Sequence, residues 1–366
     1  MKDHAMKIPV GILGATGMVG QRFITLLKDH PYFEVAALAA SPRSAGKPYA
    51  EAVDKRWSMR EPIPTNIAPM IVKEVEGDID EITQRVKLVF CALDMDKESI
   101  KRIEEDYASR GIAVVSNNSA HRWTSDVPMV LPEINPEHLN LIDIQRKNRG
   151  WDKGLIVVKP NCSIQSYVPL LTPLLQFKPT KVLVTTMQAV SGAGKTMETW
   201  PEMEDNVNPY IGGEEEKSEK EPLKIWGEVS DGKIVEENNI SISATCIRVP
   251  VSDGHLASVA VAFEVKPTSD QILEAWRNFN PLEGMDLPSA PEPFITYFED
   301  QNRPQTALDR DLGKGMGIAA GRLREDNILD YKFVGLSHNT IRGAAGGAIL
   351  TAELLVNKGY VEKGDT

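Results

Sequence analysis

The three cysteines are the strongest nucleophiles of this 366-residue sequence, and Cys162 has the setting that best suits catalysis. It lies in KPNCSIQSYVPLL, where a strand-like run ends and a helix-like run begins. A helix N-terminus lowers the pKa of a thiol, and the carboxyl ends of parallel strands open onto a ligand crevice. Cys162 is therefore the candidate nucleophile, although an unpaired cysteine is more often a small core residue. Cys91 in VFCAL and Cys246 in ATCIRV are typical of buried strands.

The segment CIRVPVSDGH contributes Arg248 and His255, which stand on either side of a turn marked by Pro250, Asp253 and Gly254. A guanidinium can hold a carboxylate through two hydrogen bonds, and an imidazole can exchange a proton near neutral pH. Taken alone, His255 fits a structural histidine better. Together with Cys162 it fits a nucleophile and its acid/base partner.

A glycine-rich turn, GILGATGMVGQ, stands between an apolar run and a helical pattern. Its spacing is G-x-x-G-x-x-G instead of the common G-x-G-x-x-G, but the strand-to-helix context favours a dinucleotide site over a turn kept only for packing. Backbone amides at such a helix start can hold a pyrophosphate. The residues expected to contact the cofactor here are Gly14, Thr16, Gly17, Met18, Val19 and Gly20.

The end of the second strand-like run discriminates between the two nicotinamide cofactors. An acidic residue that binds the ribose of NAD is expected there, yet the sequence reads Ser41-Pro42-Arg43-Ser44. Hydroxyls and a guanidinium would bind a 2′-phosphate, so Ser41, Arg43 and Ser44 favour NADP. The alternative is a solvated turn, because Ser and Pro also mark turns.

Two further motifs are less specific. SGAGKT at 191–196 is not a phosphate loop, since Ala189 occupies its first glycine position; its glycines instead allow close backbone approach, with Gln188 supplying an amide nearby. The charged run YIGGEEEKSEKE is a solvated face by default. Glu214 and Lys217, three residues apart, would nevertheless share one side of a helix.

The pattern of the first half of the chain predicts the sheet that positions these residues. Apolar runs at 8–13, 33–40, 86–93 and 112–116 alternate with helical patterns, and His30-Pro31 and Gly111 end two of the helices. Such alternation predicts an α/β fold, with a Rossmann-type parallel sheet in a nucleotide-binding domain over residues 1–158.

The second half has a different pattern. Strand-like runs at 181–190, 240–251 and 255–265, with one strong helix at 269–279, predict an α+β catalytic and dimerisation domain with a mainly antiparallel sheet at 159–338. Residues 197–233 between the first two runs are too long for a hairpin loop and are either a functional insertion or a solvated excursion. Residues 339–366 predict a C-terminal helix that returns to the first domain.

Composition narrows the function class. With 41 basic and 52 acidic residues, the chain has a formal charge of −11, which argues against nucleic-acid and anionic-membrane binding but leaves small anionic substrates open. The first residues lack a secretion-signal pattern and no long apolar run could span a membrane, so we expect a cytoplasmic protein. The cysteine and histidine spacing predicts neither disulfides nor a metal site.

Seven motifs, GATGxVG, SxRSAGK, NNSAHR, PNCS, QAVSGAG, EEEK and RVPVSDGH, occur in the order found in aspartate-semialdehyde dehydrogenases. The chain most resembles the archaeal and fungal branch, from about residue 8 to residue 355. The resemblance implies NADPH-dependent reduction of L-aspartyl-4-phosphate to aspartate semialdehyde and phosphate, in lysine, threonine, methionine and isoleucine biosynthesis. Lys195 and Thr196 depart from the expected continuation of the SGAG turn and leave its geometry open.

The resemblance also implies residue roles. Cys162 matches the nucleophile, Gln188 the amide that orients the acyl group, His255 the acid/base and Arg248 the α-carboxylate site. Glu214 matches a carboxylate near the substrate amino group. The matches to the phosphate pocket are Lys217, Arg122 and Asn118, and further cofactor contacts fall on Ser191, Gly192, Asn339 and Gly343. Backbone amides at Asn161 and Cys162 are expected to stabilise the oxyanion.

Three alternatives remain at this stage. Malonyl-CoA reductase resembles this branch so strongly that the motifs do not exclude it. N-acetyl-glutamyl-phosphate reductase is a weaker alternative, because the sequence resembles the diagnostic segments of that enzyme less. A non-catalytic NADP-binding redox sensor would have no use for Arg248 seven residues before His255. By resemblance we also expect a homodimer or homotetramer, with contact through the exposed sheet face of the second domain.

Overall fold

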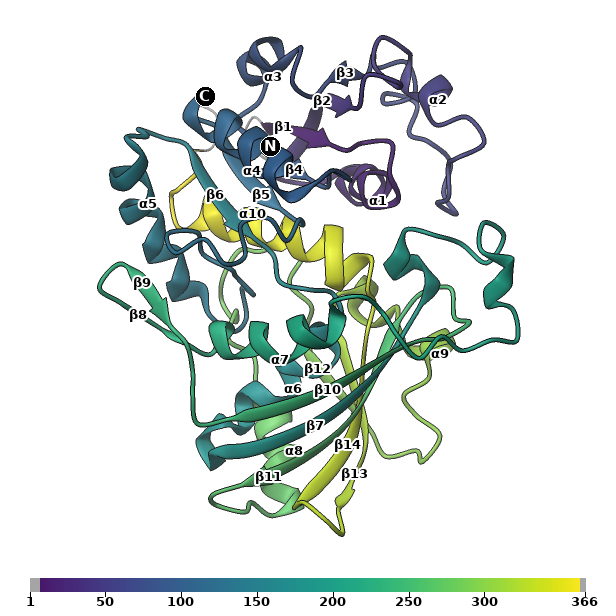
Figure 1. The fold of residues 1–366 in the computed structure, drawn as a ribbon, viewed down its shortest axis with the longest axis vertical. Coiled ribbons are helices and arrows are strands. Elements are labelled where there is room, and N and C mark those ends of the chain that lie inside the picture. Colours follow the sequence, from purple (N-terminus) through teal and green to yellow (C-terminus); the bar gives the residue numbers. More distant parts are fainter. Residues whose placement is uncertain (1–6, 363–366) are drawn as a thin grey trace, which may run out of the picture.

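The computed structural model describes residues 7–362, which form two six-stranded sheets linked by a C-terminal helix (Figure 1). The elements of the first sheet and its crossovers are β1 Ile8–Leu13, α1 Met18–Leu27, β2 Phe33–Ala40, α2 Tyr49–Ala52, β3 Lys73–Glu74, α3 Ile79–Arg85, β4 Leu88–Cys91, α4 Lys97–Ser109, β5 Ala113–Ser116, a 3-10 helix Pro136–Asn140, α5 Leu141–Arg149 and β6 Leu155–Val158.

The first sheet is entirely parallel, in the order β3-β2-β1-β4-β5-β6. This confirms the predicted Rossmann-type domain. The strand order reverses between β1 and β4, and ligands of open α/β sheets bind at the carboxyl ends of strands beside such a switch point. Leu13 and Cys91, the last residues of these two strands, pair with each other. The glycine-rich turn therefore begins at the predicted crevice.

The second half of the chain contains the other sheet. Its elements are 3-10 helices at Ser163–Ser166, Thr172–Phe177, Val190–Ala193, Pro201–Met203 and Leu312–Gly315, α6 Val168–Leu171, β7 Pro179–Gln188, α7 Glu214–Ile225, β8 Glu228–Ser230, β9 Lys233–Val235, β10 Ser241–Arg248, β11 His255–Phe263, α8 Ser269–Asn278, β12 Ile295–Phe298, α9 Thr306–Asp309, β13 Ile318–Glu325, β14 Tyr331–Ser337, a π-helical turn Ile341–Ala345 and α10 Gly346–Asn357.

This second sheet is mixed but mostly antiparallel, as predicted, in the order β10-β7-β11-β14-β13-β12. β10 runs parallel to β7, and β12 runs parallel to β13. A parallel neighbour needs a crossover connection instead of a hairpin. Residues 197–233 provide that crossover, because they carry α7 across from β7 to the outer strand β10. The segment therefore contains a structural part of the domain, α7, whereas most of residues 197–213 before it are exposed.

The C-terminal helix packs on the first domain, as predicted. Every residue of α10 except Asn357 is buried, as expected for a helix that is apolar on all sides. Its side chains share one hydrophobic cluster with α1, β1 and β2 (Figure 1). The end of the second domain is in this way fixed against the nucleotide-binding sheet.

Within residues 7–362, no helix has the length and apolar character needed to cross a membrane. Residues 1–6 and 363–366 lie outside the described part. The start of the sequence, on which the prediction against a secretion signal rests, and the two outer domain boundaries at 1 and 366 fall there.

Candidate active site

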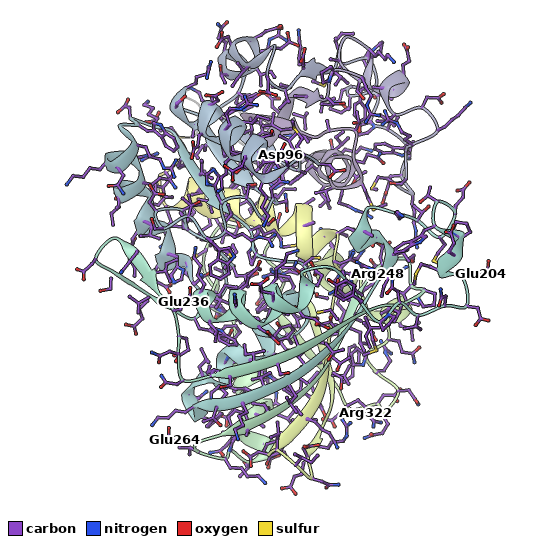
Figure 2. The ribbon with its side chains drawn as sticks, in the orientation of Figure 1. Asp96, Glu204, Glu236, Arg248, Glu264 and Arg322 are labelled. Atoms are coloured by element: carbon purple, nitrogen blue, oxygen red, sulfur yellow. The ribbon has the colours of Figure 1, made fainter. Side chains whose placement is uncertain are left out.

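Three strands of the second sheet bring the predicted catalytic side chains to one end. β7 ends at Gln188 and its parallel neighbour β10 ends at Arg248, and the two residues pair. The antiparallel strand β11 begins at His255 beside them, with Leu256 paired to Met187. Figure 2 shows Arg248 at the end of the sheet that faces the first domain. Sheet geometry therefore brings Gln188 together with Arg248 and His255, which lie 60 or more residues further along the sequence.

Cys162 meets His255 at this end of the sheet. Its Sγ lies 3.5 Å from Nε2 of His255. The other ring nitrogen, Nδ1, accepts a hydrogen bond of 3.1 Å from the backbone N–H of Ala189. A neutral imidazole with an acceptor at Nδ1 carries its hydrogen on Nε2. The His255 N–H therefore points at the sulfur.

Burial controls the protonation of both groups. It lowers the pKa of His255 to about 3, with a further contribution from the Arg248 charge, so this imidazole is neutral at pH 7. Burial also raises the pKa of the Cys162 thiol to about 11, and the Glu214 carboxylate adds to that increase. The expectation of a lowered thiol pKa was wrong for this state. The helix that follows Cys162 is a 3-10 turn of four residues, too short to offset desolvation.

Arg248 is a buried charge that forms no ion pair within residues 7–362. The residue is 5% exposed, and among the described residues its guanidinium has one hydrogen-bond acceptor, the Ala189 carbonyl oxygen at 2.7 Å. A Cβ placed on Gly192 would lie 2.7 Å from Nη1 of Arg248 and 3.0 Å from Nε2 of His255. The guanidinium thus lies close to the Cys162–His255 pair and has N–H groups free for an anionic ligand.

Glu214, the first residue of α7, connects the remaining predicted groups. Its Oε1 accepts from Nδ2 of Asn161 at 3.0 Å and from Nζ of Lys217 at 2.8 Å, and its Oε2 lies 3.4 Å from Nε2 of Gln188. The backbone N–H of Asn161 donates to Glu221 at 2.6 Å. That amide is already engaged, which corrects its predicted part in an oxyanion site and leaves the Cys162 N–H for that part.

The predicted cofactor residues of the first domain line a cavity of about 490 Å³. Gly14, Thr16 and Gly17 lie on one side of it, and Ser41, Arg43 and Ser44 on another. Gly14 has a φ of +88°, and a Cβ there would lie 2.2 Å from the Ala92 carbonyl oxygen, so only glycine fits. Met18, Val19 and Gly20 form the first turn of α1, which starts at this cavity. The arrangement suits a dinucleotide with its phosphates at the helix start.

The C-terminal segment reaches the site from the other side. Asn339 donates from Nδ2 to Oγ of Ser191 at 2.8 Å and accepts at Oδ1 from the Gly254 N–H at 2.8 Å. A Cβ on Gly343 would lie 2.8 Å from Cβ of Cys162. Both predicted residues therefore border the reactive groups, and Gly343 leaves the space that the Cys162 side chain occupies.

Known proteins resemble the chain along nearly its whole length. A family model described as "Semialdehyde dehydrogenase, NAD binding domain" matches residues 9–142, and one described as "Semialdehyde dehydrogenase, dimerisation domain" matches residues 171–342. The aspartate-semialdehyde dehydrogenase of Archaeoglobus fulgidus is 45% identical over 358 residues, covering 96% of this chain and 99% of the relative. The chain belongs to the aspartate-semialdehyde dehydrogenase family.

Further relatives agree with this membership. The Schizosaccharomyces pombe aspartate-semialdehyde dehydrogenase is 44% identical over 361 residues, covering 96% of this chain and 99% of the relative. The structure of the Candida albicans aspartate-semialdehyde dehydrogenase with NADP superposes with a TM-score of 0.85 at 39% identity, covering 97% of this chain and all of that one. The resemblance to the archaeal and fungal branch is thereby confirmed, and the matched dimerisation domain is consistent with a homo-oligomer.

The three predicted phosphate-pocket residues all have partners within the protein, Lys217 through its contact with Glu214. Arg122 is buried, with Nη1 on Glu221 at 2.8 Å and Nε on the Lys159 carbonyl oxygen at 3.0 Å. The Asn118 amide group both accepts from and donates to the Leu93 backbone. Lys217, which is half-buried, is the more accessible cation of the predicted set. Asn118 lies instead beside the cofactor cavity, which Leu93 lines.

The sequence did not predict a place in the site for three residues, and it did not predict the geometry of the SGAGKT loop. Glu221 and Lys159 are buried charges near Cys162, and Arg56 adds a second cation to the cofactor cavity. Lys159 and Glu221 lie within the segments KPNCSIQSYVPLL and YIGGEEEKSEKE, but the sequence alone does not show that their charges are buried. In the SGAGKT loop, Lys195 Nζ lies 4.4 Å over the Trp200 ring and away from the site, so the unexpected charge is accommodated at the surface.

Proposed function

We propose that the chain is an NADP-dependent aspartate-semialdehyde dehydrogenase that reversibly reduces L-aspartyl-4-phosphate to L-aspartate 4-semialdehyde and phosphate through a Cys162 thioester. This reaction belongs to the synthesis of lysine, threonine, methionine and isoleucine. The observation that carries the proposal is the contact of Cys162 with His255 beside the unpaired Arg248. A thiol, a proton-carrying ring and a free guanidinium match an acyl substrate that bears a carboxylate.

In the first step the Cys162 sulfur attacks the acyl carbon, the carbon–oxygen bond to phosphate breaks, and a thioester forms. The phosphate leaves as hydrogen phosphate with the proton that the thiol has given up, so charge and atoms balance. Arg248 holds the α-carboxylate and sets the distance between the acyl carbon and the sulfur. Lys217, the accessible cation next to Glu214, attracts the leaving phosphate.

In the second step the thioester carbon is reduced and the sulfur departs. NADPH supplies the hydride when it is bound, and the cavity lined by Gly14, Arg43 and Ser44 would hold it. The Nε2–H of His255 points at the sulfur and stabilises it as a departing thiolate. The backbone N–H of Cys162 holds the oxyanion. Gln188, fixed on Glu214 and Thr186, keeps the acyl group oriented.

Arg43→Glu is expected to weaken NADPH binding by at least about tenfold and NADH binding much less. Arg43 is exposed at the cavity rim, where a carboxylate would repel the 2′-phosphate and leave the ribose hydroxyls accessible. Titration of both cofactors by fluorescence measures the two Kd values. Arg60→Glu, which changes the same charge outside the cavity lining, is the matched control. Equal losses for NADPH and NADH would contradict the role of Arg43.

Arg248→Leu is expected to raise KM for aspartate semialdehyde and to lower kcat/KM by about 10²-fold, because the lost guanidinium both binds and positions the carboxylate. Arg248→Lys should recover part of the loss, since an ammonium keeps the charge but not the two parallel hydrogen bonds. Steady-state kinetics measures both, with Arg277→Leu on the exposed side of α8 as control. If Arg248→Leu kept the wild-type kcat/KM, the main argument for assigning aspartate semialdehyde as the substrate would be lost.

We also propose that three segments of the chain have separate roles. We assign cofactor binding to residues 1–158, catalysis and subunit contact to 159–338, and packing on the first domain to 339–366. A homodimer or homotetramer formed through the outer face of the second sheet would cover Leu183 of β7, which is 49% exposed. The cytoplasm remains the location predicted from the sequence.

Phosphate-dependent reduction of NADP with aspartate semialdehyde tests the proposed function. The reaction should require phosphate, because phosphate is the acceptor of the acyl group in this direction. Malonyl-CoA with NADPH, assayed in parallel, should give no comparable rate. If malonyl-CoA were turned over faster than aspartate semialdehyde, the chain would be a malonyl-CoA reductase. If the protein bound NADP but turned over neither substrate, it would be a redox sensor.

A further inference from the structure

Lys159, the residue after β6, is a buried lysine three residues before Cys162. It is 1% exposed, and its backbone is fixed on both sides, by Ser116 at the N–H and by Arg122 at the carbonyl. Its ammonium donates to the Pro160 carbonyl oxygen at 3.1 Å, the one acceptor that it has within residues 7–362. An ammonium has three N–H donors, and burying it without an anion is unfavourable.

The C-terminal segment places this side chain next to the Cys162 side chain. A Cβ on Gly343 would lie 2.8 Å from Cβ of Cys162, and a Cβ on Gly347 would lie 2.8 Å from Cε of Lys159. Helical residues four apart share one face, with Cβ positions about 5–6 Å apart. The thiol and the end of the lysine therefore lie over the same helix face, about one turn apart.

The surrounding charges leave Lys159 without a dedicated anion. The carboxylate that acts on it, Glu221, is already held by Arg122 and by the Asn161 N–H. Burial lowers the pKa of Lys159 to about 7, and Cys162 acts in the opposite direction. The charged and titratable groups that act on the two residues are His255, Glu214, Arg122, Arg248, Arg342 and Glu221.

His255 is not arranged to take the thiol proton. Its Nδ1 accepts from Ala189, so its Nε2 already carries a hydrogen where it faces the sulfur. Accepting a second proton there would create a buried imidazolium beside Arg248, which is unfavourable. The cations that act on the thiol are Lys159, Arg122 and Arg248. Arg122 is paired with Glu221 and Arg248 is the proposed site of the substrate carboxylate, which leaves Lys159 to balance the charge of the thiolate.

We propose that Lys159 is a positioning residue of the reaction whose ammonium is the counter-ion of the Cys162 thiolate. When the thiol loses its proton and the neutral amine of Lys159 gains one, the pair becomes thiolate and ammonium without a change in net charge. No bond forms to Lys159. The inference rests on the proposed function, because it explains how the nucleophile of that reaction becomes ionised in a buried site.

The rate at which iodoacetamide alkylates Cys162, followed by mass spectrometry of its peptide over a range of pH, tests the inference. Lys159→Met should slow alkylation at neutral pH by about tenfold, because loss of the cation raises the pKa of the thiol. Lys159→Arg should restore part of the rate, since it keeps the charge. Lys159→Gln is a second neutral variant, whose amide can still donate to Pro160 if Lys159→Met is unstable. Thermal melting identifies the folded variants.

Lys224→Met is the matched control. Lys224 is also buried and its Nζ donates to the Arg122 carbonyl oxygen, but it is not among the charges that act on the thiol. Its variant should alkylate at the wild-type rate. A folded neutral variant of Lys159 that also alkylates at the wild-type rate would overturn the inference. Alkylation needs no substrate, so this failure is separate from a failure of the proposed function, which turnover of Cys162→Ala tests.

Discussion

Cys162→Ala is expected to lower kcat by at least about 10³-fold while leaving NADPH binding nearly unchanged. In the proposed mechanism the thiol provides the covalent route, and alanine cannot form a thioester. The cofactor cavity is lined by residues of the first domain, so loss of one sulfur atom in the other part of the site should not alter it. Steady-state kinetics and cofactor titration on the same preparation measure the two effects.

Cys246→Ala is the matched control for this prediction. Cys246 is a free, buried cysteine of β10, with its sulfur 3.5 Å from Oγ of Ser218 and no contact with His255. Its replacement should leave kcat close to wild type. Turnover that persists in Cys162→Ala and disappears in Cys246→Ala would assign the chemistry to Cys246 of β10 and refute the proposed site.

His255→Asn is expected to lower kcat by about 10²- to 10⁴-fold with a small change in KM. The neutral ring holds its Nε2–H at 3.5 Å from the sulfur, a position that a shorter amide does not reproduce. Loss of this donor should affect the departing thiolate more than it affects binding of the substrate, whose carboxylate we place on Arg248. Single-turnover kinetics separates the chemical steps from binding and release.

A second buried histidine controls for the structural effect of that change. The ring nitrogens of His138 contact the Asn135 amide and the Gly227 carbonyl oxygen, both at 2.9 Å. His138→Asn should lower the melting temperature but not kcat of the folded enzyme. If His255→Asn behaved in the same way, His255 would be a structural residue and another donor would act on the sulfur.

The first domain was predictable because its local signals agree. Continuous apolar runs gave β1 and β2 with their observed bounds, and a left-handed glycine at 111 ends the turn after α4, as the sequence indicates. The site residues on strand ends were also predictable, since PNCS and RVPVSDGH carry both the chemistry and the turn.

The features that the sequence did not predict have a physical cause in common. Helix α7 buries polar and charged residues, which are Glu214, Ser218, Glu221 and Lys224, so a hydropathy pattern presents it as a solvated face. The same limitation hides Lys159, because only the tertiary structure shows that its ammonium is buried. Desolvation of the Cys162 thiol, which reverses the expected pKa shift, is likewise a property of packing and not of spacing.

The central claim is that the substrate acyl group is carried on Cys162. Mixing the enzyme with aspartate semialdehyde and NADP in the absence of phosphate should release about one NADPH per site, because the thioester then lacks its acceptor. Peptide mapping by mass spectrometry should find the acyl group on the peptide that contains Cys162, and added phosphate should remove it. An acyl group on Cys91 or Cys246, or full turnover with no acylated cysteine, would contradict the account.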